Sequence, residues 1–475
     1  MTVRSKTKMR MVAAVLAVGV LVLSACSESD DSSSTASPPP APAATEAPAP
    51  APAPAATEAA APAPAPAADA GSDAGDASCF ANHKPPRGGG DKYVVYMTSL
   101  NIGNAWQTAA QNLGLAVAKM PPFNECIEVR SDLTTPDPES QISQVQSMVA
   151  AGADGIISYA LSPTAINSAY RDACEQGVVV IIFDATVTEP CAYNVSYITS
   201  VPTLPNGDLA EHPFMGYNAM AELLRLMEGD DEIFVSHGVV GTSTDNVHYG
   251  SALAALEQVA PDTEILTEYE GRWSSAQQQA ETAKALASFP DVEGIFCGYG
   301  ETGCVNALRA VDKEIPVSGE TSNFFRLRLL EGWPGVSIGS PPAQGGIAMK
   351  IMAAILLDGP AGIPKDIEVP YQIVTADNVR ECTGDYQTEG CNVFPEGTVS
   401  DEDTADIFNV MLPEASLSAS RTGEPNPGDV AEPYTAEYLA SLEQDPSRRY
   451  ITRNACPDGW SEGVLSEGLD GCVEG

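Results

Sequence analysis

Asp184 is the residue whose place in the sequence most directly suggests chemistry. It follows the apolar run from Val178 to Phe183, which is long enough for a strand buried on both faces. Ligands of parallel sheets bind beyond the carboxyl ends of the strands, where a carboxylate can accept charge-assisted hydrogen bonds. The alternative is an aspartate that only forms the turn. The position therefore predicts a binding residue.

Motifs that would indicate catalysis are absent from the sequence. The glycines at 238–241 and 298–300 are too few for a phosphate loop or a GxGxxG fingerprint, and no GxSxG is present. There is no CxxC, the four histidines are scattered, and the acidic pair Asp401 and Asp403 lacks calcium-loop spacing. We therefore expect a protein that is not an enzyme and has no cofactor and no metal.

The elements before Asp184 place it at the edge of a sheet. Asp137 and Pro138 are a predicted N-cap and first-turn pair, opening a helix with one apolar face formed by Ile142, Val145, Met148 and Val149. The residues 154–159 predict a strand, and Ser162 with Pro163 is expected to cap a second helix that Gly177 closes. This alternation of helices and strands with short connections predicts an α/β fold with a parallel sheet.

Similar units continue along the chain. A strand is predicted at 93–97, with a helix after it, and 195–200 is expected to be extended and to leave the first lobe. A second series of helices and strands runs from Met215 to Leu357. The 475 residues are too many for one core. We therefore expect two α/β lobes with a cleft between them.

The charge balance is strongly acidic. Asp and Glu number 64 against 24 Lys and Arg, so the formal charge is 64 − 24 = 40 negative. This excess argues against binding to nucleic acid, which requires clusters of basic residues. Solubility in a salty or acidic setting is the simplest explanation of the excess.

The N-terminus predicts export and lipidation. Basic residues at positions 4–10 precede an apolar run at 11–23, and Leu23-Ser24-Ala25-Cys26 resembles the lipobox of bacterial lipoproteins. Residues 1–25 are then a signal peptide, and lipidated Cys26 anchors the chain to the outer face of the cell membrane. An ordinary signal peptide or a short anchor is the alternative.

Two segments lie outside the predicted lobes. Residues 26–78 are rich in Pro and Ala and nearly free of large apolar residues, which predicts a disordered tether, with a polyproline partner site as the alternative. Residues 381–475 form a C-terminal extension rich in Asp, Glu, Pro and Gly. We expect a disulfide-containing appendage that lies across a lobe.

Ten cysteines remain after Cys26, an even number in an exported chain, which favours disulfides. Spacing does not determine the connectivity. The pairs favoured are Cys297 with Cys304, Cys382 with Cys391, Cys456 with Cys472, Cys174 with Cys191, and Cys79 with Cys126.

From about Lys92 to Val374 the chain resembles the type I periplasmic binding proteins, in their sugar (ribose-binding-protein-like) branch. The matching segments are QISQVQSMVAAGADGIISYALSPTAI, EQGVVVIIFDA, HGVVGTS, ALASFPDVEGIFCGYGETGCVNALRAV and VSIGSPPAQGGIAM. The resemblance implies two Rossmann-like lobes with parallel sheets joined by a three-segment hinge. An N-terminal lobe would comprise 90–198 and 341–367, and a C-terminal lobe 199–340 and 368–380.

The resemblance also implies a set of ligand-binding residues. In the family, planar polar side chains hold the edge of a sugar and aromatic rings pack on its faces. The positions that match are Asn104, Trp106, Gln107, Asp184, His248, Trp273, Tyr299, Glu320 and Ser340. Four have alternatives: Asn104 as a helix N-cap, Trp106 as a core residue, His248 as a surface residue, and Thr321 in place of Glu320.

Three positions depart from the family pattern. Ala185 and His248 stand where the family has arginines, and Tyr299 replaces an amide. These departures argue against a pentose or hexose in the usual pose and favour a less polar, modified or differently shaped ligand.

These features predict an ABC importer's solute-binding lipoprotein, a monomer that binds a sugar, polyol or related small molecule and presents it to the permease. It would touch the membrane only through its lipid anchor. The alternative is a ligand-binding surface sensor that signals to a membrane partner. Genes next to this one would distinguish the two, since a permease and an ATPase indicate import and a histidine kinase indicates sensing.

Overall fold

The structure, a computed structural model, describes residues 79–80, 84–100, 103–134, 137–198, 200–227, 232–386 and 390–443. The predicted leader, Cys26, the tether, and the pair Cys456 and Cys472 lie outside these residues. Within them, no helix is both long enough and apolar enough to cross a membrane.

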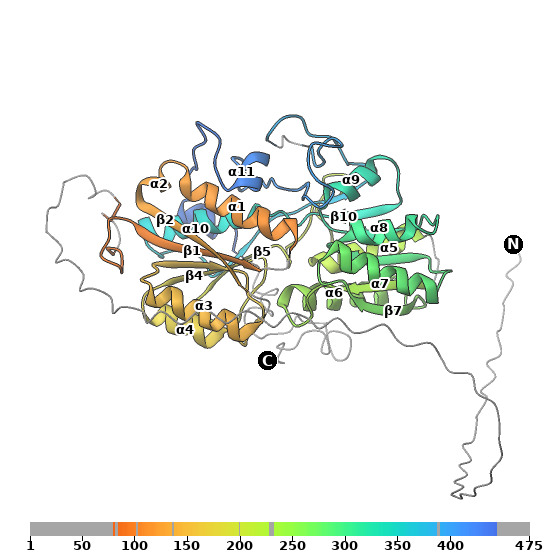
Figure 1. Cartoon of the computed structure of the whole chain (residues 1–475), viewed down its shortest axis with the longest axis horizontal. Coiled ribbons are helices and arrows are strands. Elements are labelled where there is room, and N and C mark those ends of the chain that lie inside the picture. The colour runs from red at the N-terminus through yellow and green to blue at the C-terminus, as the bar shows by residue number, and fades with distance from the viewer. Residues whose placement is uncertain are drawn as a thin grey trace, which may run out of the picture. The chain divides into compact units, whose positions relative to one another are not determined.

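Lobe one is built on a six-stranded sheet in the order β11-β5-β4-β3-β1-β2, in which all neighbouring strands are parallel. Its strands are β1 (Tyr93–Leu100), β2 (Ile127–Thr134), β3 (Gly155–Ser158), β4 (Val179–Phe183), β5 (Tyr193–Ser196) and β11 (Asp366–Glu368). Its helices are α1 (Ala105–Lys119), α2 (Phe123–Cys126), α3 (Pro138–Ala150), α4 (Asn167–Glu175) and α10 (Gln344–Asp358). Helices α1 and α10 cover one face of the sheet, and α3 and α4 cover the other (Figure 1).

Lobe two contains the second six-stranded sheet, in the order β12-β10-β9-β8-β6-β7, which is parallel except for β12. Its strands are β6 (Glu232–His237), β7 (Glu264–Glu270), β8 (Gly294–Gly298), β9 (Val317–Gly319), β10 (Gly335–Ile338) and β12 (Ile373–Thr375). Its helices are α5 (Met215–Met227), α6 (Ser243–Val259), α7 (Ser275–Ser288), α8 (Glu301–Arg309) and α9 (Asn323–Leu330). Helices α5 and α6 pack together, as do α7 and α8.

The chain passes between the two sheets three times: between β5 and α5, between β10 and α10, and between β11 and β12. These crossings form a three-segment hinge. The predicted fold class, two α/β lobes with largely parallel sheets, is confirmed.

Local sequence signals set several element boundaries. Asp137 caps α3 as predicted, since its side chain accepts a hydrogen bond of 2.8 Å from the Ser140 amide, and Pro138 is the first helical residue. The prediction that Ser162 caps the next helix is wrong. Its hydroxyl accepts from the amides of Thr164 and Ala165 in a turn, and α4 begins only at Asn167.

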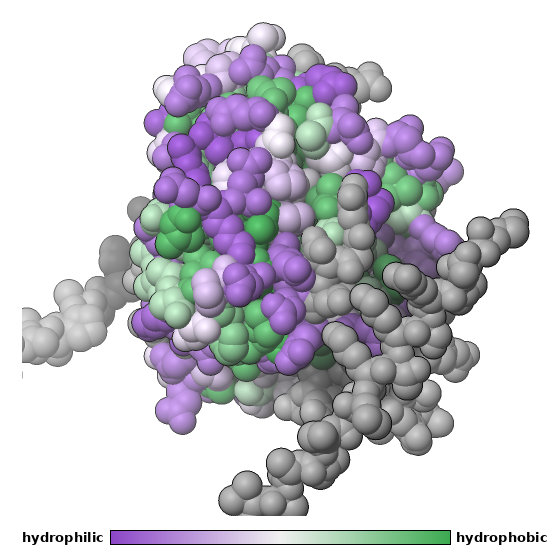
Figure 2. Space-filling view, turned by 90° about the vertical axis from the view of Figure 1, so that its right-hand side faces the viewer, coloured by the Kyte–Doolittle hydropathy of each residue, from purple (hydrophilic) through white to green (hydrophobic). Residues whose placement is uncertain are grey.

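The large apolar side chains fill the interiors of both lobes. The strands β3 and β4 are buried along nearly their whole length, as expected for central strands of a covered parallel sheet. On the face shown in Figure 2, hydrophilic and hydrophobic residues are interspersed. Among the described residues, most of the large apolar side chains are buried in the cores.

Four of the five predicted disulfides lie among the described residues, and all four are present. They are Cys79–Cys126, Cys174–Cys191, Cys297–Cys304 and Cys382–Cys391.

The described part of the C-terminal extension, residues 381–386 and 390–443, contains the short helices α11 (Leu417–Thr422) and α12 (Ala436–Ala440). It contacts both lobes rather than one. Its polar contacts with lobe two include Arg326–Asp406 and Asn323–Phe394, and those with lobe one include Asn112–Ser420 and Lys350–Glu414. Helix α11 packs against α1 (Figure 1).

Candidate functional site

A cavity lies between the two lobes, at the carboxyl ends of their strands. Its lining residues are Asn104, Trp106, Gln107, Asp184, Tyr197, Thr244, Trp273, Tyr299, Glu320 and Ser340. Eight of the nine residues predicted from the sequence are therefore brought together here. The centre of a water-sized sphere can move through about 20 Å³ of the cavity, which is room for about one water molecule.

Asp184 stands directly after β4 in a left-handed backbone conformation, with φ at 63°. Aspartate tolerates this region better than most residues, and the Ser196 hydroxyl donates to the Asp184 carbonyl at 2.6 Å. Asp184 is 5% exposed, and its carboxylate accepts a long hydrogen bond of 3.4 Å from the Gln344 side chain. Burial raises the pKa of Asp184 to about 7, although Gln344 and Tyr197 oppose the rise.

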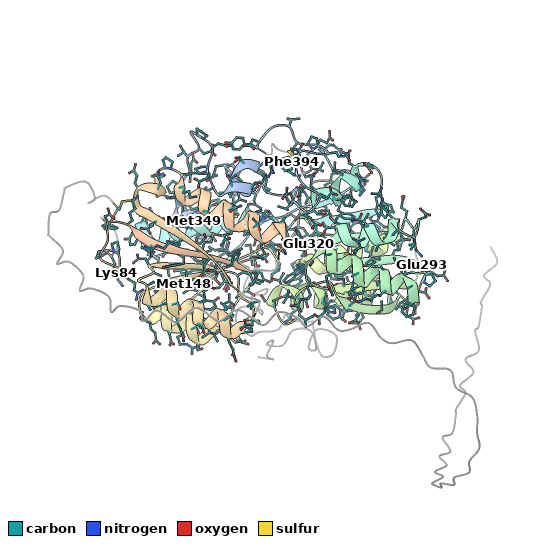
Figure 3. All side chains as sticks on the ribbon, viewed as in Figure 1. Lys84, Met148, Glu293, Glu320, Met349 and Phe394 are labelled. Carbon is teal, nitrogen blue, oxygen red and sulfur yellow. A yellow bond between two sulfur atoms is a disulfide. The ribbon has the colours of Figure 1, made fainter. Side chains whose placement is uncertain are left out.

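Glu320 directly follows β9 and reaches the cavity from lobe two, at the edge that faces lobe one (Figure 3). It is 5% exposed, and its Oε1 accepts from the Tyr299 amide at 3.0 Å. Burial raises the pKa of Glu320 well above its ordinary value, and the nearby charges of Glu301 and Asp184 raise it further. The neighbouring Thr321 hydroxyl instead accepts from Thr404, so the geometry favours Glu320 over Thr321.

The start of α1 supplies three lining residues. Asn104 is both N-cap and lining residue: its Oδ1 accepts from the Gln107 amide at 2.8 Å, and its Nδ2 donates to the Trp273 carbonyl at 3.3 Å. Trp106 is likewise both a core residue and a residue that lines the cavity. Its ring stacks on Phe183, and its indole N–H donates to the Ser340 carbonyl. The Gln107 side chain is turned back to accept from the Leu100 amide.

Trp273 lies in a tight turn after β7. Arg272 and Trp273 are both left-handed, with φ of 53° and 54°, a rare conformation for such large residues. The indole occupies the space above Gly238, where a Cβ would come within 2.1 Å of the ring. The ring also makes an edge-to-face contact with Tyr159, at 6.4 Å between centroids. The backbone thus holds Trp273 over the cavity.

Tyr299 connects three parts of the chain. Its hydroxyl accepts from the Trp106 amide at 3.3 Å and donates to the Glu402 carbonyl of the extension at 3.1 Å. The extension therefore touches a residue that lines the cavity.

His248 is the one predicted site residue that does not line the cavity. It lies on α6, is 8% exposed, and stands behind two lining residues: Nε2 is 3.5 Å from the Tyr197 hydroxyl, and Nδ1 is 4.0 Å from Glu320 Oε1. Burial lowers the pKa of His248 to about 4, so the ring is neutral near pH 7. The alternative of a surface position is also wrong.

Two lining residues, Tyr197 and Thr244, were not predicted from the sequence. Tyr197 follows β5 in the first hinge segment. An aromatic residue at the end of a strand is the sequence feature that could have indicated a lining position. Thr244 belongs to the first turn of α6, next to the capping residue Thr242. The sequence around Thr244 indicates only a helix cap, so nothing in it distinguishes a capping residue from one that lines the cavity.

The two lobes touch each other around the cavity. Besides Asn104–Trp273 and Trp106–Tyr299, hydrogen bonds join Tyr159 to Thr244 at 3.2 Å and Thr186 to Ser243 at 2.8 Å. This is a closed arrangement, and the remaining space is far smaller than the roughly 300 Å³ of small ligand pockets. A small organic molecule can therefore enter only if the lobes part or the indole rings move.

Two hinged α/β lobes that close on a cavity at their strand ends define a two-lobed binding protein. A family model, described as the periplasmic binding protein domain, matches residues 95–360, more than half of the chain. The chain belongs to this family, which confirms the resemblance seen in the sequence. No curated protein sequence matches the chain significantly.

Several solved structures share the fold. A solute-binding protein of an ABC transporter from Thermobispora bispora is 21% identical, with a TM-score of 0.52, covering 72% of this chain and 98% of that one. One from Actinobacillus succinogenes with bound D-allose is 19% identical, with a TM-score of 0.51, covering 60% and 98%. The fructose-binding periplasmic domain of a hybrid two-component system is 15% identical, with a TM-score of 0.50, covering 60% and 91%.

Proposed function

We propose that this protein is a lipid-anchored solute-binding protein of an ABC importer, which binds a sugar or sugar-like molecule between its lobes. One observation supports this most: aromatic and acidic side chains from both lobes line a single cavity at the strand ends. A ligand that touches both lobes favours the closed state, which the permease then recognises. No bond of the ligand is made or broken.

Binding is tested by thermal unfolding of the purified full-length protein against sugars, polyols, cyclitols and small aromatic solutes, together with their amino derivatives. We expect at least one compound to stabilise the protein, by about 2.7 kcal/mol at a concentration of 100 times Kd. Trp273→Ala should abolish the stabilisation, because it removes the ring that lobe two places over the cavity.

Trp333→Ala is the matched control, since this tryptophan of lobe two lies outside the cavity lining. It should keep the ligand-dependent shift. Two results contradict the proposal: no compound stabilises the protein, or Trp273→Ala and Asp184→Ala both bind as the parent does.

The anchor makes a separate prediction. In the full-length protein, Cys26→Ser should abolish acylation and move the protein from the membrane fraction to the soluble or secreted fraction. Fractionation and mass spectrometry of the mature N-terminus measure this. Retention of the variant on the membrane, at the level of the parent, would contradict lipidation at Cys26.

The alternative, a surface sensor that signals to a membrane partner, uses the same cavity. The likeness to the periplasmic domain of a two-component system keeps it open as a second candidate. Co-purification from membranes separates the two: a permease and ATPase indicate import, whereas a histidine kinase indicates sensing.

A further inference from the structure

The cavity contains two buried carboxyl groups, one from each lobe, and neither pairs with a Lys or Arg side chain in the described part of the chain. Asp184 accepts only from neutral donors, and Glu320 accepts from the Tyr299 amide. The nearest ionisable nitrogen, on His248, lies 4.0 Å from Glu320 in a ring that is neutral near pH 7. The lining itself contains no Lys or Arg.

Several buried or half-buried carboxylates elsewhere in the described part of the chain have basic partners, whereas Asp154 and Glu301 accept from backbone amides. Asp406, Glu414 and Glu189 are each paired within the chain, with the partners Arg326, Lys350 and Arg171. Isolated buried charges are costly, which explains this pairing. The cavity is therefore a place where two carboxyl groups from different lobes lack a Lys or Arg partner, which a bound cation would supply.

The rest of the lining suits a positive charge. Trp106 and Trp273 enter from opposite lobes, and Tyr197 and Tyr299 complete the aromatic surface. The face of an aromatic ring attracts cations, with indole the strongest, by up to about 2 kcal/mol when the pair is desolvated. Carboxylates together with indole and phenol rings are the groups that recognise ammonium, quaternary ammonium and guanidinium ions.

We infer that the solute carries a positive charge, as an amino sugar, an amino polyol or another small organic cation, which lies between Asp184 and Glu320 and against the indole rings. This inference rests on the proposed function and specifies its ligand class. It also supplies a reason for closure. The two carboxylates belong to different lobes and repel one another when ionised, so a cation between them favours the closed state.

The positive charge of the solute determines whether its affinity rises or falls with pH. A cation whose charge is fixed, such as a quaternary ammonium ion, requires ionised carboxylates, so its affinity should rise from pH 6 to pH 8, through the pKa of about 7 at Asp184. A neutral solute that accepts a hydrogen bond from a protonated carboxyl would show the opposite trend. The other ionisable groups that face the two carboxylates are Tyr159, Tyr197, Tyr299, Glu301 and His248, with Asp245 beside His248.

The pKa values of the three tyrosines and of His248 lie outside that pH range. Burial raises the pKa of the three tyrosines well above 10 and lowers that of His248 to about 4. The tyrosines and the histidine therefore stay neutral between pH 6 and pH 8. A rising affinity across this range reports the carboxylates.

The test uses matched pairs of probes that differ in charge: D-glucosamine and D-glucose, 1-amino-1-deoxy-D-sorbitol and D-sorbitol, choline and 3,3-dimethylbutan-1-ol. Binding to the full-length protein is measured by calorimetry in EDTA, which removes divalent metal ions. In at least one pair the cation should bind at least about tenfold more tightly than its neutral partner. Asp184→Asn and Glu320→Gln should each remove most of this preference.

Glu331→Gln is the charge-matched control, because Glu331 is exposed and outside the cavity. It should keep the preference, which separates a local effect from attraction to the net charge of −40. If neutral sugars or polyols bind as tightly as the cations, the inference is overturned while the proposed function stands. If no member of any pair binds, and no neutral solute stabilises the protein, both are overturned.

Discussion

Arg326→Met should lower the free energy of unfolding by about 3–5 kcal/mol, because it leaves a buried carboxylate without its counterion. Arg326 is 0% exposed and lies on α9 of lobe two. Its guanidinium donates to the Ser337 hydroxyl at 2.9 Å, to the Asn392 carbonyl at 2.8 Å and to Asp406 at 3.2 Å. Two of these three partners belong to the C-terminal extension, so the loss also weakens its attachment. Urea denaturation measures the change.

A double variant separates the lost ion pair from lost packing. Arg326→Met with Asp406→Leu removes both charges, and it should be more stable than Arg326→Met alone, since an apolar pair of similar volume often replaces a buried ion pair at little cost. Lys284→Met, which breaks an exposed pair with Glu281, should cost at most about 1 kcal/mol. A cost for Arg326→Met no larger than that of Lys284→Met would contradict the assigned role.

The extension could not be placed from its sequence for a physical reason. Its burial depends on partners that are distant along the chain: Arg326 is 80 residues before Asp406, and Asn112 is 308 residues before Ser420. Its own helices are short, and its residues carry no sustained periodicity. A local pattern indicates disulfides and turns but does not show that the segment spans two lobes.

Elements buried on both sides were predictable, and so was the exposed edge strand β7, but the edge strand β2 was not. Strand β4 is a continuous apolar run, and the caps of α3 and α6 are explicit in the sequence. Strand β2 lies at the edge of its sheet and reads IEVRSDLT, in which charged residues interrupt the apolar ones. Its place comes from pairing with β1 along its whole length, which local propensity does not reveal.

The candidate site also contains residues that were predictable from the sequence and others that were not. Asp184, Glu320 and Ser340 stand directly after or close behind strands, and the topology of a parallel sheet brings such positions together. His248 lies outside the lining, because a helix position in the sequence does not reveal whether its side chain reaches the cavity or contacts lining residues, here Tyr197 and Glu320. The packing of the indole rings in the closed arrangement could not be predicted from the sequence either, since it depends on contacts between the lobes.

Asp184→Asn should make the ligand-free protein more stable than the parent, increasingly so as the pH rises. The pKa of Asp184 is raised from 3.8 to about 7, so the folded state retains a proton that the unfolded state releases. The stability that this carboxyl contributes is complete below pH 3.8 and is lost as the pH rises through about 7. The whole difference corresponds to about 4 kcal/mol. Between pH 5 and pH 8, the advantage of the variant should therefore grow by about 2–3 kcal/mol, measured by urea denaturation at each pH.

His248→Gln supplies the control, because its expected trend has the opposite sign. Burial lowers the pKa of His248 from 6.5 to about 4, so the parent loses stability as the pH falls through this range, and the variant does not. The advantage of His248→Gln should therefore grow toward acid, whereas that of Asp184→Asn grows toward base. Subtracting each variant from the parent at the same pH cancels the titrations that the two proteins share. An advantage of Asp184→Asn that is the same at pH 5 and pH 8 would mean that this carboxyl is already ionised in the closed cavity, and that some other group supplies its counterion.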